Sequence, residues 1–161
     1  MRENWLFPLL LFIFVTGCST QQTPQVSADS KTIQSIMPPQ ILLQTKEHSS
    51  LHSVLGSYEW SKEDQSSEQT VRMDNEPPHI LAKDLKPTMI ERGKVVTIRF
   101  NDSESKPSLN VHLWGEDGEK EEVSINESKL TLPEKKGQYI YEITCEWPQG
   151  NASYIFVAEI K

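Results

Sequence analysis

The feature that most constrains the fold of this chain is an alternation of apolar and polar residues near its C-terminus. From residue 139 to residue 147 every second side chain is aromatic, aliphatic or a thiol, and Glu142, Thr144 and Glu146 stand between them. Successive side chains of a β-strand point to opposite faces, so this pattern predicts a strand with one buried face and one wet face. The turn at 148–151 then leads into a second apolar stretch with Tyr154, Phe156, Ala158 and Ile160 at every second position, which predicts a terminal hairpin. Truncation of that last strand is expected to unfold the domain.

Short stretches of the same kind recur through the rest of the chain, separated by turn residues such as Pro77-Pro78 and Glu116-Asp117-Gly118. The predicted strands are 54–60, 80–85, 95–100, 109–114, 122–125, 130–132, 139–147 and 153–160. No stretch is a convincing helix. About seven or eight short strands in roughly 100 residues predict an all-β fold, an antiparallel β-sandwich.

One segment of this predicted sandwich resembles a known type of domain. Lys136-Gly137-Gln138-Tyr139-Ile140-Tyr141 is similar to the Gly-x-Tyr-x-(Tyr or Cys) start of the next-to-last strand of immunoglobulin-like domains, with Tyr139 at the corner position. Together with 56–60, Pro77-Pro78 and 147–154, it resembles uncharacterised immunoglobulin-like lipoproteins of Gram-positive bacilli over about 100 residues. The resemblance implies the sandwich and no activity. Glu59 stands where a flanking cysteine would be expected in such relatives, so no disulfide is implied.

The N-terminus has the composition of an export signal. A single base, Arg2, precedes an uncharged apolar run from Trp5 to Val15. Eleven residues of helix rise about 16 Å, roughly half of a hydrocarbon core, so the run is too short for a permanent membrane span. We therefore predict that residues 1–17 form a signal peptide.

The four residues that end this run indicate how the chain is held. Val15-Thr16-Gly17-Cys18 resembles the lipobox of bacterial lipoproteins. The resemblance implies cleavage between Gly17 and Cys18, with a diacylglyceryl group on the Cys18 thiol and further acylation, such as palmitate. Two acyl chains anchor a protein stably, so the expected location is the extracytoplasmic face of the cell membrane. An uncleaved anchor or a plain secretory signal is the alternative.

The mature chain divides into two parts by composition. Residues 18–53 are rich in Gln, Ser and Thr and contain Pro24, Pro38 and Pro39, which is typical of a flexible linker. Within them, 39–43 could pair as a strand. Residues 54–161 then form the predicted immunoglobulin-like domain.

Charge and cysteine content exclude several functions. The formal net charge is -7 and the bases are interspersed with acids, which argues against nucleic acid and against attraction to anionic lipid headgroups. With Cys18 acylated, Cys145 is the remaining cysteine, so no intrachain disulfide is expected. Its place in an apolar strand favours a buried, inert thiol over a reactive one.

No catalytic or metal-binding motif is recognisable, so we expect no cofactor, no bound metal and no enzymatic activity. His48 and His52 lack a third ligand, and the acidic clusters 74–76 and 116–119 lack the spaced ligands of a calcium loop. The Asp117-Gly118 pair suits a hairpin turn.

Trp60 and Trp114 are the candidate binding residues. Tryptophans of a sandwich usually lie in the core, but exposed together these two would form a platform for a glycan or a peptide. The leading hypothesis is a lipid-anchored binding or accessory module with an envelope protein or glycan partner. The alternatives are a receptor for a small molecule or metal ion, which a deep pocket would favour, and a cell-wall-active enzyme, which would need two converging carboxylates.

Overall fold

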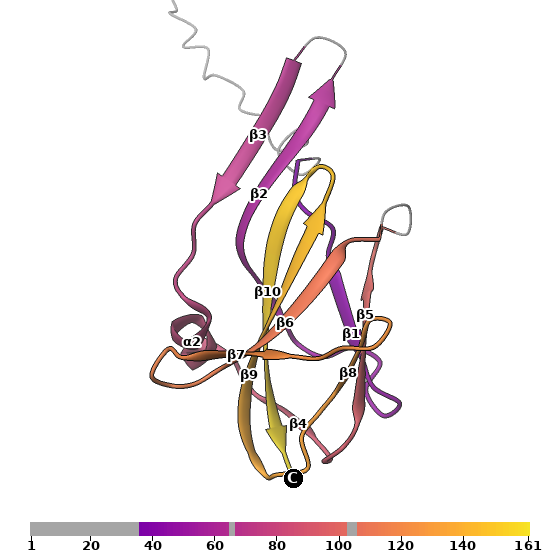
Figure 1. Cartoon of the computed structure of the whole chain (residues 1–161), viewed down its shortest axis with the longest axis vertical. Helices are drawn as coiled ribbons and strands as arrows, with labels where there is room; N and C mark the ends of the chain where they lie inside the picture. The colour runs from indigo at the N-terminus through magenta and orange to yellow at the C-terminus, as the bar shows by residue number, and fades with distance from the viewer. Residues whose placement is uncertain (1–35, 65–66, 103–105) are drawn as a thin grey trace, which may run out of the picture.

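The computed structural model describes residues 36–64, 67–102 and 106–161, and in them the chain is an all-β sandwich. Two sheets pack face to face (Figure 1). The predicted fold class is therefore confirmed.

Ten strands and two short helical turns make up the described residues. The strands are β1 (Ile41–Gln44), β2 (Val54–Asp64), β3 (Ser67–Met73), β4 (Thr88–Ile90), β5 (Val95–Phe100), β6 (Ser108–Trp114), β7 (Lys120–Val123), β8 (Lys129–Thr131), β9 (Gly137–Trp147) and β10 (Gly150–Ile160). Between β3 and β4 lie the helix α2 (Pro78–Leu81) and the 3₁₀ turn η1 (Ala82–Asp84).

The smaller sheet has the order β1-β5-β8, and the larger sheet has the order β3-β2-β10-β9-β6-β7. The terminal hairpin of β9 and β10 lies at the centre of the larger sheet, with all pairings antiparallel along this path. The short β4 pairs in parallel with the last residues of β10, beyond the point where β2 has diverged. Each sheet therefore turns one face toward the other and one face outward.

The core lies between the sheets, and β9 contributes to it as its alternation predicts. Tyr141, Ile143, Cys145 and Trp147 are buried, whereas Glu146 is exposed. Glu142 was expected on the wet face but is buried, because its carboxylate accepts from the Trp114 indole N–H. The ring of Tyr141 stacks on Phe156 of β10 with centroids 4.9 Å apart. This packing supports the expectation that the fold requires its last strand.

The outer face of the larger sheet is not entirely wet. In β10 the side chains of Ile155 and Val157, which alternate with the inward-facing residues, are also buried. The segment that contains α2 and η1 lies against this face, where α2 contacts β9 and η1 contacts β10, and Ala82 is buried there. A second, smaller apolar layer therefore covers part of the outer face.

The structure corrects the predicted start of the domain at residue 54. Part of the segment assigned to the linker belongs to the sandwich, because β1 pairs with β5 and the side chains of Ile36, Leu43 and Leu51 are buried. The Leu51 N–H donates to the Leu43 carbonyl at 2.7 Å, which closes a short loop after β1. The interpretation of 39–43 as a strand was the better alternative, although β1 begins two residues later.

The predicted strand over 80–85 is wrong. The helix α2 begins at Pro78, a residue type that suits the first turn of a helix, and the 3₁₀ turn η1 continues the segment to Asp84. The strands β3 and β4 were not predicted, since neither shows apolar alternation of useful length.

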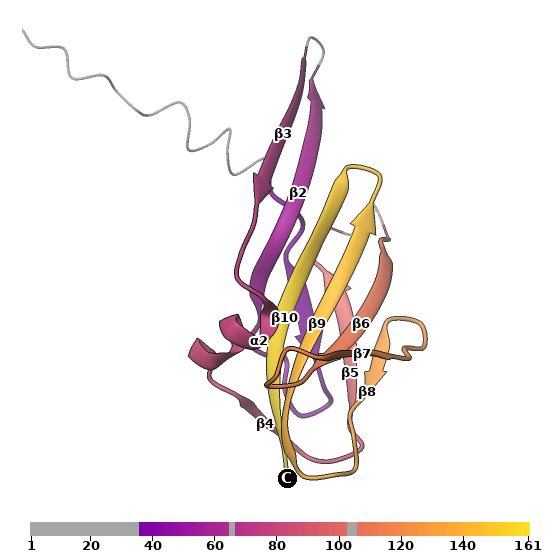
Figure 2. The ribbon, with the colours of Figure 1, turned by 60° about the vertical axis from the view of Figure 1, so that its left-hand side comes forward.

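The β2–β3 hairpin projects beyond the rest of the larger sheet (Figures 1 and 2). β10 pairs with β2 only as far as Trp60, opposite Gly150, whereas β3 pairs with β2 from Tyr58 to Asp64. The outer part of the hairpin therefore has no third strand beside it among the described residues.

Candidate functional site

The predicted anchor lies outside the described residues. Gly17 and Cys18 precede Ile36, the first residue that the structure describes. Within the described residues no helix is long and apolar enough to cross a membrane. The lipid on Cys18 therefore stays a prediction from the residue pattern.

Trp60 is a core residue. Its ring packs edge-on against Trp147, with centroids 5.2 Å apart, and the side chain is only 8% exposed. Its place in β2, opposite Val71 of β3 and Gly150 of β10, directs the indole between the sheets. Trp60 can therefore form the wall of a site but not an open aromatic platform.

Trp114 lies on the opposite, outer face of the larger sheet, where its indole is already engaged. Its Nε1–H donates to Glu142 Oε2 at 2.9 Å, and the imidazole of His79 stacks on the ring with centroids 5.6 Å apart. The Lys120 ammonium lies 5.6 Å from the ring centroid, at cation–π distance. Trp114 therefore fastens α2 to the sheet, and the condition for a joint platform with Trp60 is not met.

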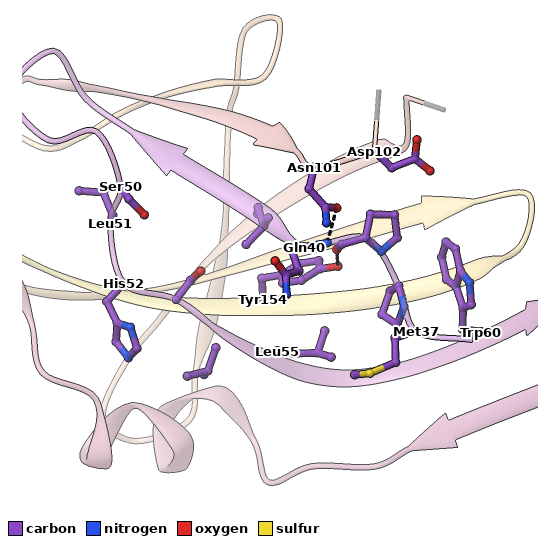
Figure 3. Close-up of a pocket in the computed structure, with 15 residues that line it drawn as sticks. Met37, Gln40, Ser50, Leu51, His52, Leu55, Trp60, Asn101, Asp102 and Tyr154 are labelled. Carbon is purple, nitrogen blue, oxygen red and sulfur yellow. Dashed lines mark hydrogen bonds between the residues drawn. The ribbon is translucent and has the colours of Figure 1, made fainter. Parts of the chain in front are cut away.

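An open groove of about 830 Å³ lies beside the first described residues (Figure 3), and we call it the N-terminal groove. It is lined by residues 37–41 and 50–55 together with Trp60, Asn101, Asp102 and Tyr154. Trp60, Leu51 and Tyr154 are buried at its base, whereas Gln40, His52 and Asn101 are exposed at its rim. An apolar base with a polar rim is typical of binding sites.

Hydrogen bonds hold the wall formed by residues 37–41. The Asn101 N–H donates to the Gln40 carbonyl at 3.0 Å, and the Gln40 N–H donates to Asn101 Oδ1 at 2.8 Å. The Tyr154 hydroxyl donates to the carbonyl of Pro39. Burial raises the pKa of Tyr154, so the phenol stays protonated and keeps this bond. The groove is thus preformed in the fold.

The remaining polar candidates have structural roles. His48 belongs to the loop after β1, where its N–H donates to Thr45 Oγ1 at 3.0 Å, so it does not share a helix face with His52. No group of three side chains suited to a metal occurs in the described part of the chain.

The acidic clusters are likewise part of the scaffold. Asp117 Oδ1 accepts from the Glu119 N–H at 3.2 Å, and Gly118 has a φ of 87° in the turn between β6 and β7. This confirms the predicted turn. In the other cluster, Asp74 forms an ion pair of 3.2 Å with Arg72.

Cys145 is buried in the core, as its alternating position predicts. Burial raises the pKa of its thiol to about 12, because no neighbouring cation offsets the loss of solvation. A thiol in this state is a poor nucleophile. The inert interpretation of Cys145 is therefore favoured by the structure.

Comparisons of this chain with protein-family profiles, curated proteins and solved structures find no match. The N-terminal groove was not predicted, because the residues before 54 were assigned to a linker. The short apolar stretch at 39–43 was the signal that could have revealed it.

Proposed function

We propose that this protein is a lipid-anchored, non-enzymatic binding module on the extracytoplasmic face of a bacterial cell membrane. We further propose that it holds a segment of an envelope protein in the N-terminal groove. The observation that carries the binding role is the groove itself, a preformed hollow with an apolar base and a polar rim. The anchor is supported by the lipobox pattern that ends in Cys18.

The lining of the groove favours a polypeptide partner. Met37 and Leu55 present apolar surface, and Gln40, Ser53 and Asn101 bring amide and hydroxyl groups that suit a peptide backbone. No Lys or Arg is among the described lining residues, so an anionic partner gains no cation there. The immunoglobulin-like sandwich is part of this proposal, and its role is to hold the groove rigidly.

A small-molecule receptor is the second candidate. The volume of about 830 Å³ lies within the range of roughly 300 to 1,000 Å³ that is usual for small-molecule sites. The groove is open to solvent, however, whereas sites for drug-sized ligands bury most of the ligand. The polypeptide is therefore the better match.

The anchor is tested by intact mass and membrane partitioning of the chain made in a bacterium, wild type beside Cys18→Ala. The expected wild-type product has lost residues 1–17 and has gained a lipid mass on Cys18, and the variant is neither lipidated nor retained. An unlipidated secreted product, or an uncleaved precursor, would contradict the anchor.

The groove is tested with a photo-crosslinking residue at His52 on its rim, and with the same residue at Lys135, in the loop between β8 and β9, as the control. A defined envelope protein should be captured from intact cells at position 52 and not at 135. Met37→Arg should abolish the capture, whereas Met89→Arg, at another exposed methionine that lies on β4, should not. Equal capture at both positions, or no effect of Met37→Arg, would refute the groove as the site.

A further inference from the structure

β3 is an edge strand that offers a free backbone edge. It stands at one end of the larger sheet and pairs with β2 alone among the described strands. The unpaired N–H and C=O groups on its other side are a template for another strand. Because the β2–β3 hairpin projects from the sandwich, this edge is accessible (Figures 1 and 2).

The charges of β3 are self-complementary. If a second copy of β3 pairs antiparallel about a two-fold axis at Thr70, Glu68 of each copy stands opposite Arg72 of the other. Opposite charges directly across an antiparallel pair are favourable. Moving the axis by one residue to Val71 would instead place Glu68 opposite Asp74, two like charges. The residues therefore select the register centred on Thr70.

Within a single chain Glu68 lacks a favourable neighbour. Its cross-strand partner in β2 is Glu63, a like charge, and Glu68 forms no ion pair within the described residues. Like charges directly opposite each other destabilise a strand pair. The Arg72 of a second copy would supply the cation that this position lacks.

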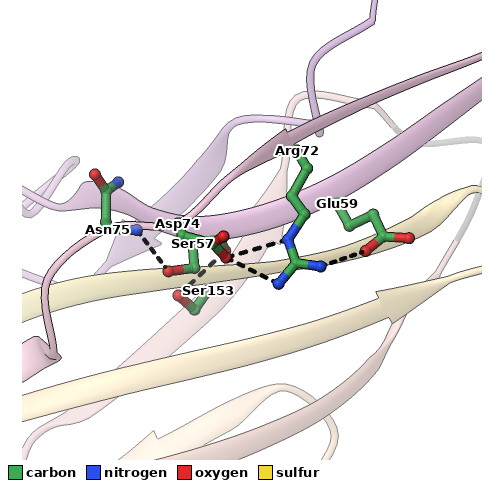
Figure 4. Close-up of polar contacts among 6 residues, drawn as sticks. All are labelled: Ser57, Glu59, Arg72, Asp74, Asn75 and Ser153. Atoms are coloured by element: carbon green, nitrogen blue, oxygen red, sulfur yellow. Dashed lines mark hydrogen bonds and ion pairs between the residues drawn. The ribbon is translucent and has the colours of Figure 1, made fainter.

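Arg72 is suited to that role. Its guanidinium lies on the exposed outer face, 3.2 Å from Asp74 and 3.8 Å from Glu59 (Figure 4). These anions raise the pKa of Arg72, chiefly through the hydrogen bond to Asp74, so the charge is always present. A guanidinium has five N–H donors, so it can donate to a further carboxylate beside these two.

We propose that two copies of this protein associate through their β3 edges, antiparallel and with the two-fold axis at Thr70, so that the two larger sheets become continuous. The interaction surface is the backbone edge of residues 68–72, and the reciprocal Glu68–Arg72 pairs set its register. The partner is a second copy of this chain, and a strand of another protein is the alternative that the experiments below exclude or reveal.

Disulfide trapping tests the register. Directly opposed residues of an antiparallel pair have Cα atoms about 4.5 to 5.5 Å apart, which a disulfide can span. The full chain carrying Thr70→Cys, purified in mild detergent and oxidised with copper phenanthroline, should become a covalent dimer. Met73→Cys is the matched control, since it is exposed on the same strand but lies about six residues, roughly 20 Å, from its own copy in this register. The chain without an added cysteine, oxidised in the same way, shows how much covalent dimer forms through Cys18 or Cys145.

Charge exchange tests the partner. Two differently tagged copies are expressed together, and their joint purification is measured. Glu68→Arg alone and Arg72→Glu alone should each reduce joint purification at least tenfold, because like charges then face each other. A copy with Glu68→Arg paired with a copy with Arg72→Glu should restore it, which shows that both variants fold. No joint purification of wild-type copies, equal trapping at positions 70 and 73, or no recovery in the mixed pair would overturn the proposal.

Discussion

Leu43 provides a direct test of whether the residues before 54 belong to the domain. Its side chain is 0% exposed and lies in β1 opposite Ile98 of β5. Leu43→Ala removes its isobutyl contacts and leaves a cavity in the core, which costs about 2 to 5 kcal/mol of unfolding free energy. Leu42, the next residue back along the strand, is 38% exposed, so Leu42→Ala should cost less than about 1 kcal/mol. Both substitutions replace leucine by alanine in the same strand, so they change strand propensity equally. The difference between their two unfolding free energies therefore reports the burial of Leu43.

The assay is urea unfolding followed by tryptophan fluorescence, which reports the core because Trp60 and Trp147 pack together there. With a urea dependence of about 1 to 3 kcal/mol per molar, the Leu43→Ala midpoint should fall by roughly 1 to 3 M. If Leu43→Ala and Leu42→Ala agree within about 0.5 kcal/mol, β1 is not part of the cooperative unit and the linker interpretation to residue 53 is correct.

Three further measurements test other parts of the structure. Gly150→Ala would place a Cβ, at a φ of 150°, against the backbone of β2, so it should cost about 2 to 3 kcal/mol in urea unfolding. The neighbouring exposed Asn151→Ala should cost under about 0.5 kcal/mol, and equal costs would contradict the close approach. Iodoacetamide at pH 8 should label Cys145 at least about 100-fold more slowly in the folded protein than in urea, since burial raises its pKa to about 12. The pKa of Glu47 should lie below its ordinary value and return toward it in Lys94→Ala, because the Lys94 ammonium donates to its carboxylate at 2.7 Å. Since the folded pKa is lowered, the pair contributes stability above the ordinary pKa and loses it as the pH falls, and an unchanged NMR titration in the variant would refute this.

The strands that face the core were predictable, because a strand with one buried face has apolar side chains at every second position. The bounds of β5 match the apolar stretch 95–100, and β9 follows its alternating residues. β3 carries Ser-Glu-Gln-Thr at its start and lies on the projecting hairpin, where little core is available to select apolar residues. A strand without a buried face leaves no periodic signal, so it could not be found by this reasoning.

The segment 80–85 shows a different limit. Ile80 and Leu81 are apolar and lie near the outer face of the larger sheet. A short helix can place two apolar side chains against that face as well as a strand can, so their apolar character does not distinguish the two. The continuous run from Tyr154 to Ala158 did carry a usable signal, since a strand buried on both faces reads as unbroken apolar sequence. The sequence analysis did not use that signal, and α2 and η1 supply the second covering layer in the structure.

The candidate site was less predictable than the fold, because it depends on how distant segments meet. Sequence patterns singled out Trp60 and Trp114, yet the parity of their strands places them on opposite faces of the same sheet. The N-terminal groove combines the segment 37–41, which precedes the predicted domain, with β2 and with Tyr154 near the C-terminus. A contact between residues more than 100 positions apart, such as Tyr154 with Pro39, leaves no local pattern in either segment.

The two proposed surfaces share one strand, and this relates them physically. Leu55 and Trp60 of β2 line the N-terminal groove, and the outer part of β2 carries β3, the edge proposed to join two copies. Two-fold pairing through β3 would fix two grooves in a symmetric arrangement. A partner with two matching segments would then bind the second groove at a high effective concentration, which strengthens binding without any new contact. Anchoring both copies in one membrane would favour the same pairing by confining them to a surface, so the anchor, the edge and the groove would act together.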